Sequence, residues 1–344
     1  MVWLSRFGAA RSVVRPLVRR STSAYIKVGM RPGRGTSTFL LMPATTEIAD
    51  ETIAICRRAA EANRACQARR GNVIHLGAGE ADDLMIVADL HGNRLNFRKL
   101  LEIADLDEHP RRHLVMQEVC HGGPQYPGGD GGCMSHLLLE DCARLKTEYP
   151  ERFHFLLSNH ELAELGDYPI SKSRRMLNLQ FRAGINEMYG QRGEEVRNAY
   201  LEFLAYCPLA VRLASGVFIS HSLPDQCDRE PFDVSVLERP LCCADYKCGS
   251  PAFRLVWGRD FRAANADAFA RQVNADILIH GHEPCEAGFS APNPRQIILD
   301  GCCSHAAYLI VPVAQKLTHK QIVSRITSLH SPSRAMTLKN CARV

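Results

Sequence analysis

The 344-residue sequence predicts an α/β domain in which strands alternate with helices. Short apolar runs of strand length recur along the chain, and their continuous hydrophobicity is typical of strands buried on both faces. Helical stretches separate several of these runs, and each run ends in a cluster of polar residues. Because ligands of layered α/β domains bind beyond the carboxyl ends of the strands, we expect these clusters to form one binding site.

The expected elements alternate along the chain. An amphipathic helix over residues 48–70 comes first, with acidic side chains near its start and arginines at its end, as the helix dipole favours. The apolar runs predict strands over residues 84–88, 113–116, 153–157, 217–220 and 277–279. The remaining periodic stretches predict helices over residues 95–103, 135–147, 163–189, 194–206 and 263–273.

The distribution of charge limits the classes of partner. The formal net charge is +5, but residues 1–46 hold eight basic side chains and no acidic one, which leaves the rest of the chain mildly acidic. We therefore expect no nucleic-acid-binding surface on the folded part. The sequence also has no stretch of about 18 or more apolar residues, so we expect no membrane-spanning segment.

The same composition suggests the domain organisation and the location. Residues 1–46 are expected to be a disordered basic segment, residues 47–330 one domain, and residues 331–344 a tail. The basic segment also has the composition of an organelle transit peptide, so organelle import is the alternative to the expected cytoplasmic location. The fourteen cysteines include adjacent pairs but no C-x-x-C pair, so we expect most to be reduced and buried.

The polar clusters at the strand ends carry the chemistry. They are, in chain order, Asp89-Leu90-His91-Gly92-Asn93, Gln117-Glu118, Ser158-Asn159-His160-Glu161, His221 and His280-Gly281-His282. Alone, such a cluster has ordinary explanations, such as a polar turn, a helix cap or a buried histidine. Together they supply the nitrogen and oxygen ligands that Mn, Fe and Zn prefer, without the cysteines typical of structural zinc. Two such metals about 3.5–4 Å apart can assist an in-line phosphoryl displacement.

The order of these motifs, D-x-H-G, N-H-E, H and G-H, resembles that of the calcineurin-like metallophosphoesterases. The similarity is greatest to the serine/threonine phosphoprotein phosphatase branch, in a divergent form expected of bacteria, and extends over roughly residues 84–305. Residues 145–161 are similar to the family's passage into its Asn-His-Glu motif. Residues 216–224 resemble its His-Gly-Gly-Leu strand end, and residues 239–260 its Arg-Pro and Trp-Ser-Asp passage. His280-Gly281-His282 stands where the family has Arg-Ala-His.

The resemblance implies a particular version of the α/β fold. We expect a four-layer α/β/β/α sandwich, in which two mixed sheets pack face to face and helices cover the outer faces. A helical insertion over about residues 163–206 is expected to form a cap near the metal site.

Carried over position by position, the resemblance also implies a site for two divalent metal ions. The implied metal ligands are Asp89 and His91 for one ion, Asn159, His221 and His282 for the other, and Glu118 as the acid between them. His160 would protonate the leaving alkoxide as a general acid. Arg259 and Arg262 would clamp phosphate oxygens with a planar fork that lysine lacks.

The sequence departs from the family pattern at residues 117–123. Glu118 replaces a bridging aspartate and, although one methylene longer, is expected to bridge the metals. His121 replaces the aspartate that would orient the catalytic histidine, so no charge partner for His160 is evident. Gly122 replaces a phosphate-binding arginine. Either the site has decayed, or it has been rebuilt with His121 as an additional ligand or acid. Because the other five ligands are intact, we favour a rebuilt, active site.

The expected function is phosphoester hydrolysis of the serine/threonine protein phosphatase type. It would use two divalent metal ions (Mn, Fe or Zn) and a hydroxide held between them, with a phosphoprotein or a small phosphoester as the substrate. Two alternatives stay open, namely a nucleotide or dinucleoside polyphosphate hydrolase, and a protein that binds phosphorylated partners without cleaving them. The sequence does not indicate the oligomeric state.

Overall fold

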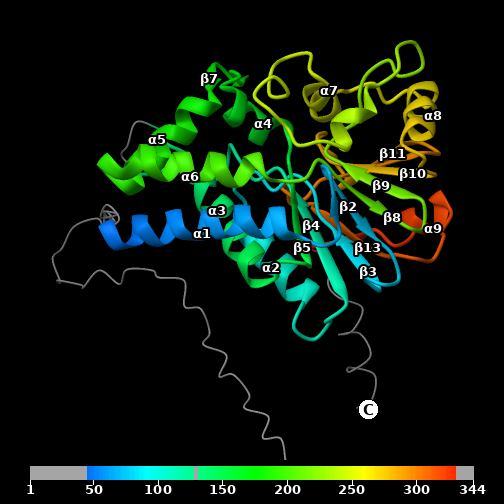
Figure 1. Ribbon diagram of the computed structural model, residues 1–344, viewed down its shortest axis with the longest axis horizontal. Helices are drawn as coiled ribbons and strands as arrows, with labels where there is room; N and C mark the ends of the chain where they lie inside the picture. The colour runs from blue at the N-terminus through cyan, green and yellow to red at the C-terminus, as the bar shows by residue number, and fades with distance from the viewer. Residues whose placement is uncertain (1–44, 128–130, 331–344) are drawn as a thin grey trace, which may run out of the picture. The chain divides into compact units, whose positions relative to one another are not determined.

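The computed structural model describes residues 45–127 and 131–330 of the chain. Two large mixed β-sheets, flanked by helices, make up this part of the chain (Figure 1). The predicted basic segment over residues 1–46 lies almost wholly outside the described residues, and the predicted tail over residues 331–344 lies entirely outside them. Both therefore stay predictions.

The larger sheet has seven strands in the order β1-β2-β8-β9-β10-β12-β11. In that order the strands are Arg69–Arg70, Val73–Leu76, Ala210–Leu213, Val217–Ser220, Ile277–His280, Gln296–Leu299 and Phe289–Asn293. Strands β9, β10 and β12 run parallel to one another, and so do β2 and β8. The other neighbours are antiparallel.

The smaller sheet has five strands in the order β14-β13-β3-β4-β5. They are Thr327–Ser328, Ala307–Pro312, Asp83–Ile86, Arg112–Gln117 and Phe153–Leu156. Strands β3, β4 and β5 are parallel, whereas β13 is antiparallel to β3. The carboxyl ends of β3, β4 and β5 therefore lie at one edge of this sheet.

Helices lie on both sides of the pair of sheets. They are α1 Thr46–Ala65, α2 Arg94–Ala104, α3 Ser135–Glu148, α4 Asn159–Gly166, α5 Leu177–Tyr189, α6 Gly193–Ala205, α7 Pro251–Trp257, α8 Ala263–Gln272 and α9 His319–Val323. Helices α1, α3, α5 and α6 pack against one another, with α3 against β5, and α8 packs beside β10 (Figure 1). None of the helices that the structure describes combines the length and the apolar composition needed to cross a bilayer.

Alternating side chains of the strands divide the apolar residues into two cores. Leu84 and Ile86 of β3 pack with Ile219 of β9 and Ile279 of β10 in an aliphatic core that both sheets share. Met85, between Leu84 and Ile86, points to the other face and packs in the core that includes the helices. This arrangement is the α/β/β/α sandwich, so the fold class predicted from the sequence is confirmed.

Most of the predicted elements appear close to their predicted bounds, but two helices differ. The first helix ends at Ala65 rather than at residue 70, because Arg69–Arg70 form β1. The single helix predicted over residues 163–189 is wrong. Helix α4 ends at Gly166, and Asp167 follows in the left-handed conformation with φ 51°. Pro169 then prevents the helix from resuming, because proline disfavours helical backbone in the residue before it.

Residues 163–206 contain more than helices. A two-stranded hairpin of β6 (Ser171–Lys172) and β7 (Arg175–Met176) separates α4 from α5. Helix α6 packs against α1, α4 and α5, so this part of the chain is joined to the helices beside the five-stranded sheet. A capping role for residues 163–206 stays a prediction.

The packing between the sheets can be tested with one substitution at two positions. Leu84→Ala is expected to lower the free energy of unfolding by about 2–5 kcal/mol, because it leaves a cavity between the sheets. Leu84 is 0% exposed, whereas Leu95 on α2 is 76% exposed. Leu95→Ala is the matched control and should change stability by no more than about 0.5 kcal/mol. Urea titration measures the free energy of unfolding of both variants. Equal decreases in the two variants would contradict the core between the sheets.

Candidate metal centre

The candidate site forms where parallel strands of both sheets end. Asp89 and His91 follow β3, Glu118 follows β4, and His160 lies at the start of α4 just after β5. His221 directly follows β9, His282 comes from the turn after β10, and Asn159 is the first residue of α4. These residues are distant in sequence, but the shared direction of their strands brings their side chains into one cluster. The structure thus brings these seven of the ten predicted site residues together.

The backbone at the cluster is turned into an unusual conformation. Eleven non-glycine residues in the described part of the chain have positive φ, and five of them are candidate site residues. These five are Asp89 (44°), His91 (41°), Glu118 (50°), His121 (64°) and His282 (72°). Positive φ costs energy for residues other than glycine, and such strained positions concentrate at functional sites.

Two close contacts fix these turns relative to one another. The N–H groups of Leu90 and His91 donate to the carbonyl of Glu118 at 2.8 and 3.0 Å, which ties the turn after β3 to the turn after β4. Gly281 is needed for another reason, since a Cβ at this position would lie 2.2 Å from Asp89 Oδ1. Any larger residue at position 281 would displace that carboxylate.

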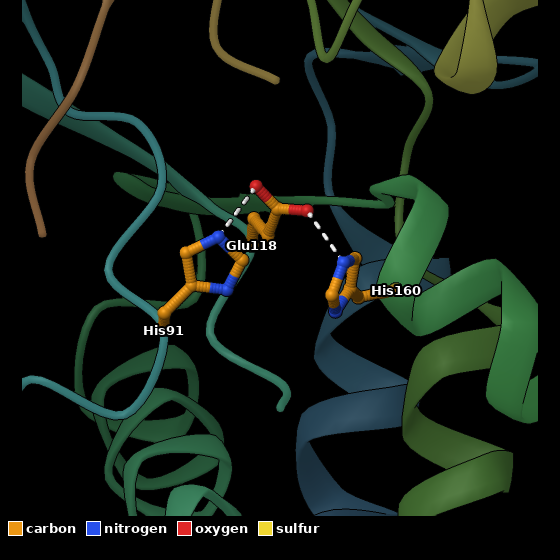
Figure 2. A group of neighbouring side chains, drawn as sticks. All are labelled: His91, Glu118 and His160. Atoms are coloured by element: carbon orange, nitrogen blue, oxygen red, sulfur yellow. Dashed lines mark ion pairs between the residues drawn. The ribbon is translucent and has the colours of Figure 1, made fainter. Parts of the chain in front are cut away.

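Glu118 lies at the centre of the cluster, with histidine nitrogens facing both of its oxygens. His91 Nε2 lies 3.4 Å from Glu118 Oε2, and His160 Nε2 lies 3.6 Å from Oε1 (Figure 2). His221 Nε2 also lies 3.6 Å from Glu118 Oε1. The Glu118 side chain is only 3% exposed, so water cannot compensate its charge.

The outer nitrogens of His91 and His221 both face oxygen acceptors. His91 Nδ1 faces the carbonyls of Cys120 and His121 at 3.4 and 3.2 Å, and a carbonyl can only accept. His221 Nδ1 faces Gln117 Oε1 at 3.0 Å. The His91 ring therefore has its proton on Nδ1 and the lone pair of Nε2 toward Glu118. Both nitrogens of His221 face amide oxygens, since its Nε2 lies 2.7 Å from Asn159 Oδ1.

The cluster continues from His221 to Asn159 and His282. Asn159 Oδ1 lies 2.7 Å from His221 Nε2 and 3.2 Å from His282 Nδ1. His282 Nε2 and Asp89 Oδ1 are buried and have no hydrogen-bond partner among the residues that the structure describes. Buried polar atoms without partners are rare, and here two of them belong to residues of one cluster.

These residues fit divalent metal ions. Two groups, one of His91, Glu118 and His160 and one of Glu118, His221 and His282, each hold their potential ligand atoms within 4.8 Å of one another. Glu118 belongs to both groups. Buried carboxylate oxygens and histidine nitrogens converge here, and a bound cation would balance the charge of the carboxylates. The nitrogen and oxygen set is the one that Mn, Fe and Zn accept.

Burial sets the protonation of these groups when no cation is bound. It raises the pKa of Asp89 well above its usual range, and the nearby Glu118 adds to this effect. Burial, followed by the charge of Glu161, raises the pKa of Glu118 to about 8. It also lowers the pKa of His221 well below its usual range and that of His282 to about 3. The rings are therefore neutral, as metal ligands must be, and a cation would displace carboxyl protons.

His121 has partners that the sequence did not reveal. Its Nδ1 lies 2.9 Å from His160 Nδ1, and its Nε2 lies 2.9 Å from Glu164 Oε1. His160 thus contacts a carboxylate through a second histidine. Glu164 follows His160 by four residues in α4, a spacing that places both on one helix face and could have indicated the connection.

Glu161 is a second acidic residue whose position sequence reasoning missed. Its Oε1 accepts hydrogen bonds from the backbone N–H groups of Val119 and Cys120 at 3.0 and 2.7 Å. Its other oxygen accepts from the Ser158 hydroxyl. Glu161 therefore holds the turn that carries Glu118 without facing the metal groups itself.

The two predicted arginines lie in different surroundings. Arg259 pairs with Glu283, donates to the carbonyl of His282 at 3.3 Å, and its charge lowers the pKa of Glu118. Arg262 is bound by Asp228 and Asp260 instead, and it contacts no other candidate residue in the described part of the chain. Both line a surface hollow of about 280 Å³. Lys172 of the hairpin also lowers the pKa of Glu118, although it was not predicted as a site residue.

Comparison with known proteins supports the fold. No protein-family model matches the sequence, and no curated protein sequence matches it significantly. A solved serine/threonine phosphatase from Saccharomyces cerevisiae, with similarity to human phosphatase PP5, superposes with a TM-score of 0.57 at 15% identity. This match covers 76% of the present chain and 82% of the yeast chain. A cold-active protein-tyrosine phosphatase of a Shewanella species gives 14% identity over 78% and 84% of the two chains, with a TM-score of only 0.48. The first match shows a shared fold, and the second is too weak to add to it.

The position of Glu118 in both groups makes a prediction about metal binding. We expect the protein to bind two divalent ions, and Glu118→Ala to weaken both by more than about tenfold, because each loses a ligand. His282→Ala should weaken only one of them. Titration calorimetry with Mn²⁺ and metal analysis after dialysis measure this difference.

His305→Ala is the control, because His305 is exposed and belongs to neither group. It should bind Mn²⁺ like the wild type. Two undiminished binding events in Glu118→Ala would show that Glu118 is not a shared ligand.

Proposed function

We propose that the protein is a metal-dependent phosphoester hydrolase of the metallophosphoesterase type. The observation that carries the proposal is the buried Glu118 carboxylate, which belongs to two groups of metal-ligating side chains at the strand ends of an α/β/β/α sandwich. The fold shared with a serine/threonine phosphatase supports the same conclusion.

Residues of both sheets would hold the two ions. Asp89, His91 and Glu118 would bind one, and Glu118 would bind the other together with the ligands that follow β5, β9 and β10, namely Asn159, His221 and His282. Bound divalent ions supply positive charge for phosphoryl oxygens and lower the pKa of water. The chain's own contribution is to bury the ligands, fix their neutral ring forms and exclude bulk water from the cluster.

Arg259 would bind the phosphate of the substrate. Its guanidinium lies beside His282 and is close enough to the cluster for its charge to act on Glu118. Arg262 lacks this role in the proposal, because its donors already bind two carboxylates. Arg259 therefore takes the place of the phosphate-binding arginine that the sequence lacks at Gly122.

We propose phosphoserine or phosphothreonine in proteins as the substrate. The phosphatase fold supports this choice, and the exposed cations of the β6–β7 hairpin, Lys172, Arg174 and Arg175, could bind acidic residues around the phosphate. A dinucleoside polyphosphate is the alternative substrate of the same site.

Hydrolysis of an aryl phosphate tests the proposed activity. We expect Mn²⁺ to stimulate it, and Asp89→Asn or His282→Ala to lower kcat/KM by at least about 100-fold, because transition-state charge loses its compensation. His305→Ala should keep wild-type activity. Persistence of full activity in both site variants would contradict the assigned site. Turnover of a dinucleoside polyphosphate in preference to a phosphopeptide would replace the proposed substrate but not the site.

The two arginines provide a matched pair for the phosphate contact. Arg259→Ala is expected to lower kcat/KM by roughly 10- to 100-fold, mainly through KM, because a charge-assisted hydrogen bond contributes about 1.5–3 kcal/mol. Arg262→Ala should have little effect. Steady-state kinetics with the aryl phosphate separates the two, and equal effects would mean that Arg259 does not bind the phosphate.

A further inference from the structure

Glu164 and His121 form a buried pair next to the metal-ligating groups. Both side chains are 0% exposed, and His121 Nε2 lies 2.9 Å from Glu164 Oε1. The same oxygen accepts a hydrogen bond from Asn178 Nδ2 at 2.8 Å. Arg182 and Arg197 lie 3.8 Å from the other oxygen and balance the negative charge of Glu164. Because a carboxylate only accepts, His121 Nε2 carries a proton.

The proton on Nε2 determines what the other nitrogen of His121 does. In the neutral ring, His121 Nδ1 is an acceptor, and it lies 2.9 Å from His160 Nδ1. The hydrogen bond between the two rings therefore requires a proton on His160 Nδ1. The ring of His121 is fixed in place, since it packs edge-on against Phe181 with centroids 5.5 Å apart.

The lone pair of His160 is consequently on Nε2. This atom faces Glu118 Oε1 at 3.6 Å, in the same group as His91 Nε2 (Figure 2). His91 shows the same pattern, with the proton on the outer nitrogen and the lone pair toward Glu118. Two histidines, His91 and His160, thus present lone pairs to one carboxylate. A ring acting as a general acid would keep the proton on Nδ1 and carry a second one on Nε2.

We propose that Glu164 is a positioning residue which, through His121, holds the His160 ring with its proton on Nδ1 and its Nε2 lone pair toward Glu118, as a metal ligand requires. In this arrangement the chain Glu164–His121–His160 replaces a direct contact between a carboxylate and His160. His121 therefore compensates for the aspartate that the sequence lacks at its position. The inference rests on the proposed metal site, and it adds His160 to the ligands that Asp89, His91 and Glu118 would supply.

The ring forms can be measured directly on the wild-type protein. Long-range ¹H–¹⁵N spectra of the full chain, metal-free and labelled at the histidine nitrogens, identify which nitrogen of each ring is protonated. We expect the Nε2–H form for His121 and the Nδ1–H form for His160. Signals are assigned by their loss in His121→Gln and His160→Gln. An Nε2–H form of His160 would overturn the inference.

Two variants of Glu164 test whether this residue sets the orientation. Glu164→Met removes the acceptor, so it should weaken Mn²⁺ binding by about 10- to 100-fold, as the loss of a group that orients a ligand does. Glu164→Gln should bind Mn²⁺ like the wild type, because His121 and Asn178 both donate to Oε1 and so select the amide oxygen there. Glu187→Met, at an exposed position of α5, is the control.

The outcomes separate this inference from the proposed activity. Unchanged Mn²⁺ affinity and an unchanged His160 form in Glu164→Met would overturn the positioning role. If that variant does not fold, the wild-type spectra and Glu164→Gln decide, and loss of the Nδ1–H form in Glu164→Gln would count against it. Phosphatase activity with an Nε2–H form of His160 would overturn this inference alone. If His121 and His160 have the expected ring forms but the protein hydrolyses no phosphoester, the result would support this inference and contradict the proposed activity.

Discussion

The structure around the candidate site depends on one buried carboxylate, Glu118. A charge that is almost fully removed from water must be balanced, and here nitrogens of three histidines face the Glu118 carboxylate at 3.4 to 3.6 Å. Without cations, burial raises the pKa of Glu118 to about 8, so the site holds protons instead. Divalent ions on both sides of Glu118 would satisfy all of these groups at once. The requirement for positive charge therefore follows from the chain itself.

The two sheets and their strand ends make this cluster possible. Parallel strands β3, β4 and β5 end at one edge of their sheet, and β9 and β10 run in parallel in the other. The aliphatic core between the sheets fixes the two edges against each other. Turns with positive φ then aim Asp89, His91, Glu118 and His282 inward, and Glu161 holds the turn after β4. A rigid scaffold of this kind can maintain strained turns.

Sequence patterns predicted five of the strands and the polar residues that cluster at their ends, but not the contacts between distant segments. The strands over residues 84–88 and 277–279 were predictable because they are continuous apolar runs followed by polar clusters. Strand β8 was missed because Arg212 interrupts its apolar run. The role of Glu164 depends on β4 and β5 lying side by side, which brings His121 to α4. Likewise, Arg262 is a natural phosphate ligand in sequence, and only folding brings Asp228 to it.

We propose that the Glu118 carboxylate lies between two bound divalent metal ions. Diffraction from crystals grown with Mn²⁺, recorded above and below the manganese absorption edge, tests it most directly. We expect two anomalous peaks, one beside His91 and the other beside His221 and His282, with the Glu118 carboxylate between them. A single peak, or peaks away from Glu118, would contradict the account.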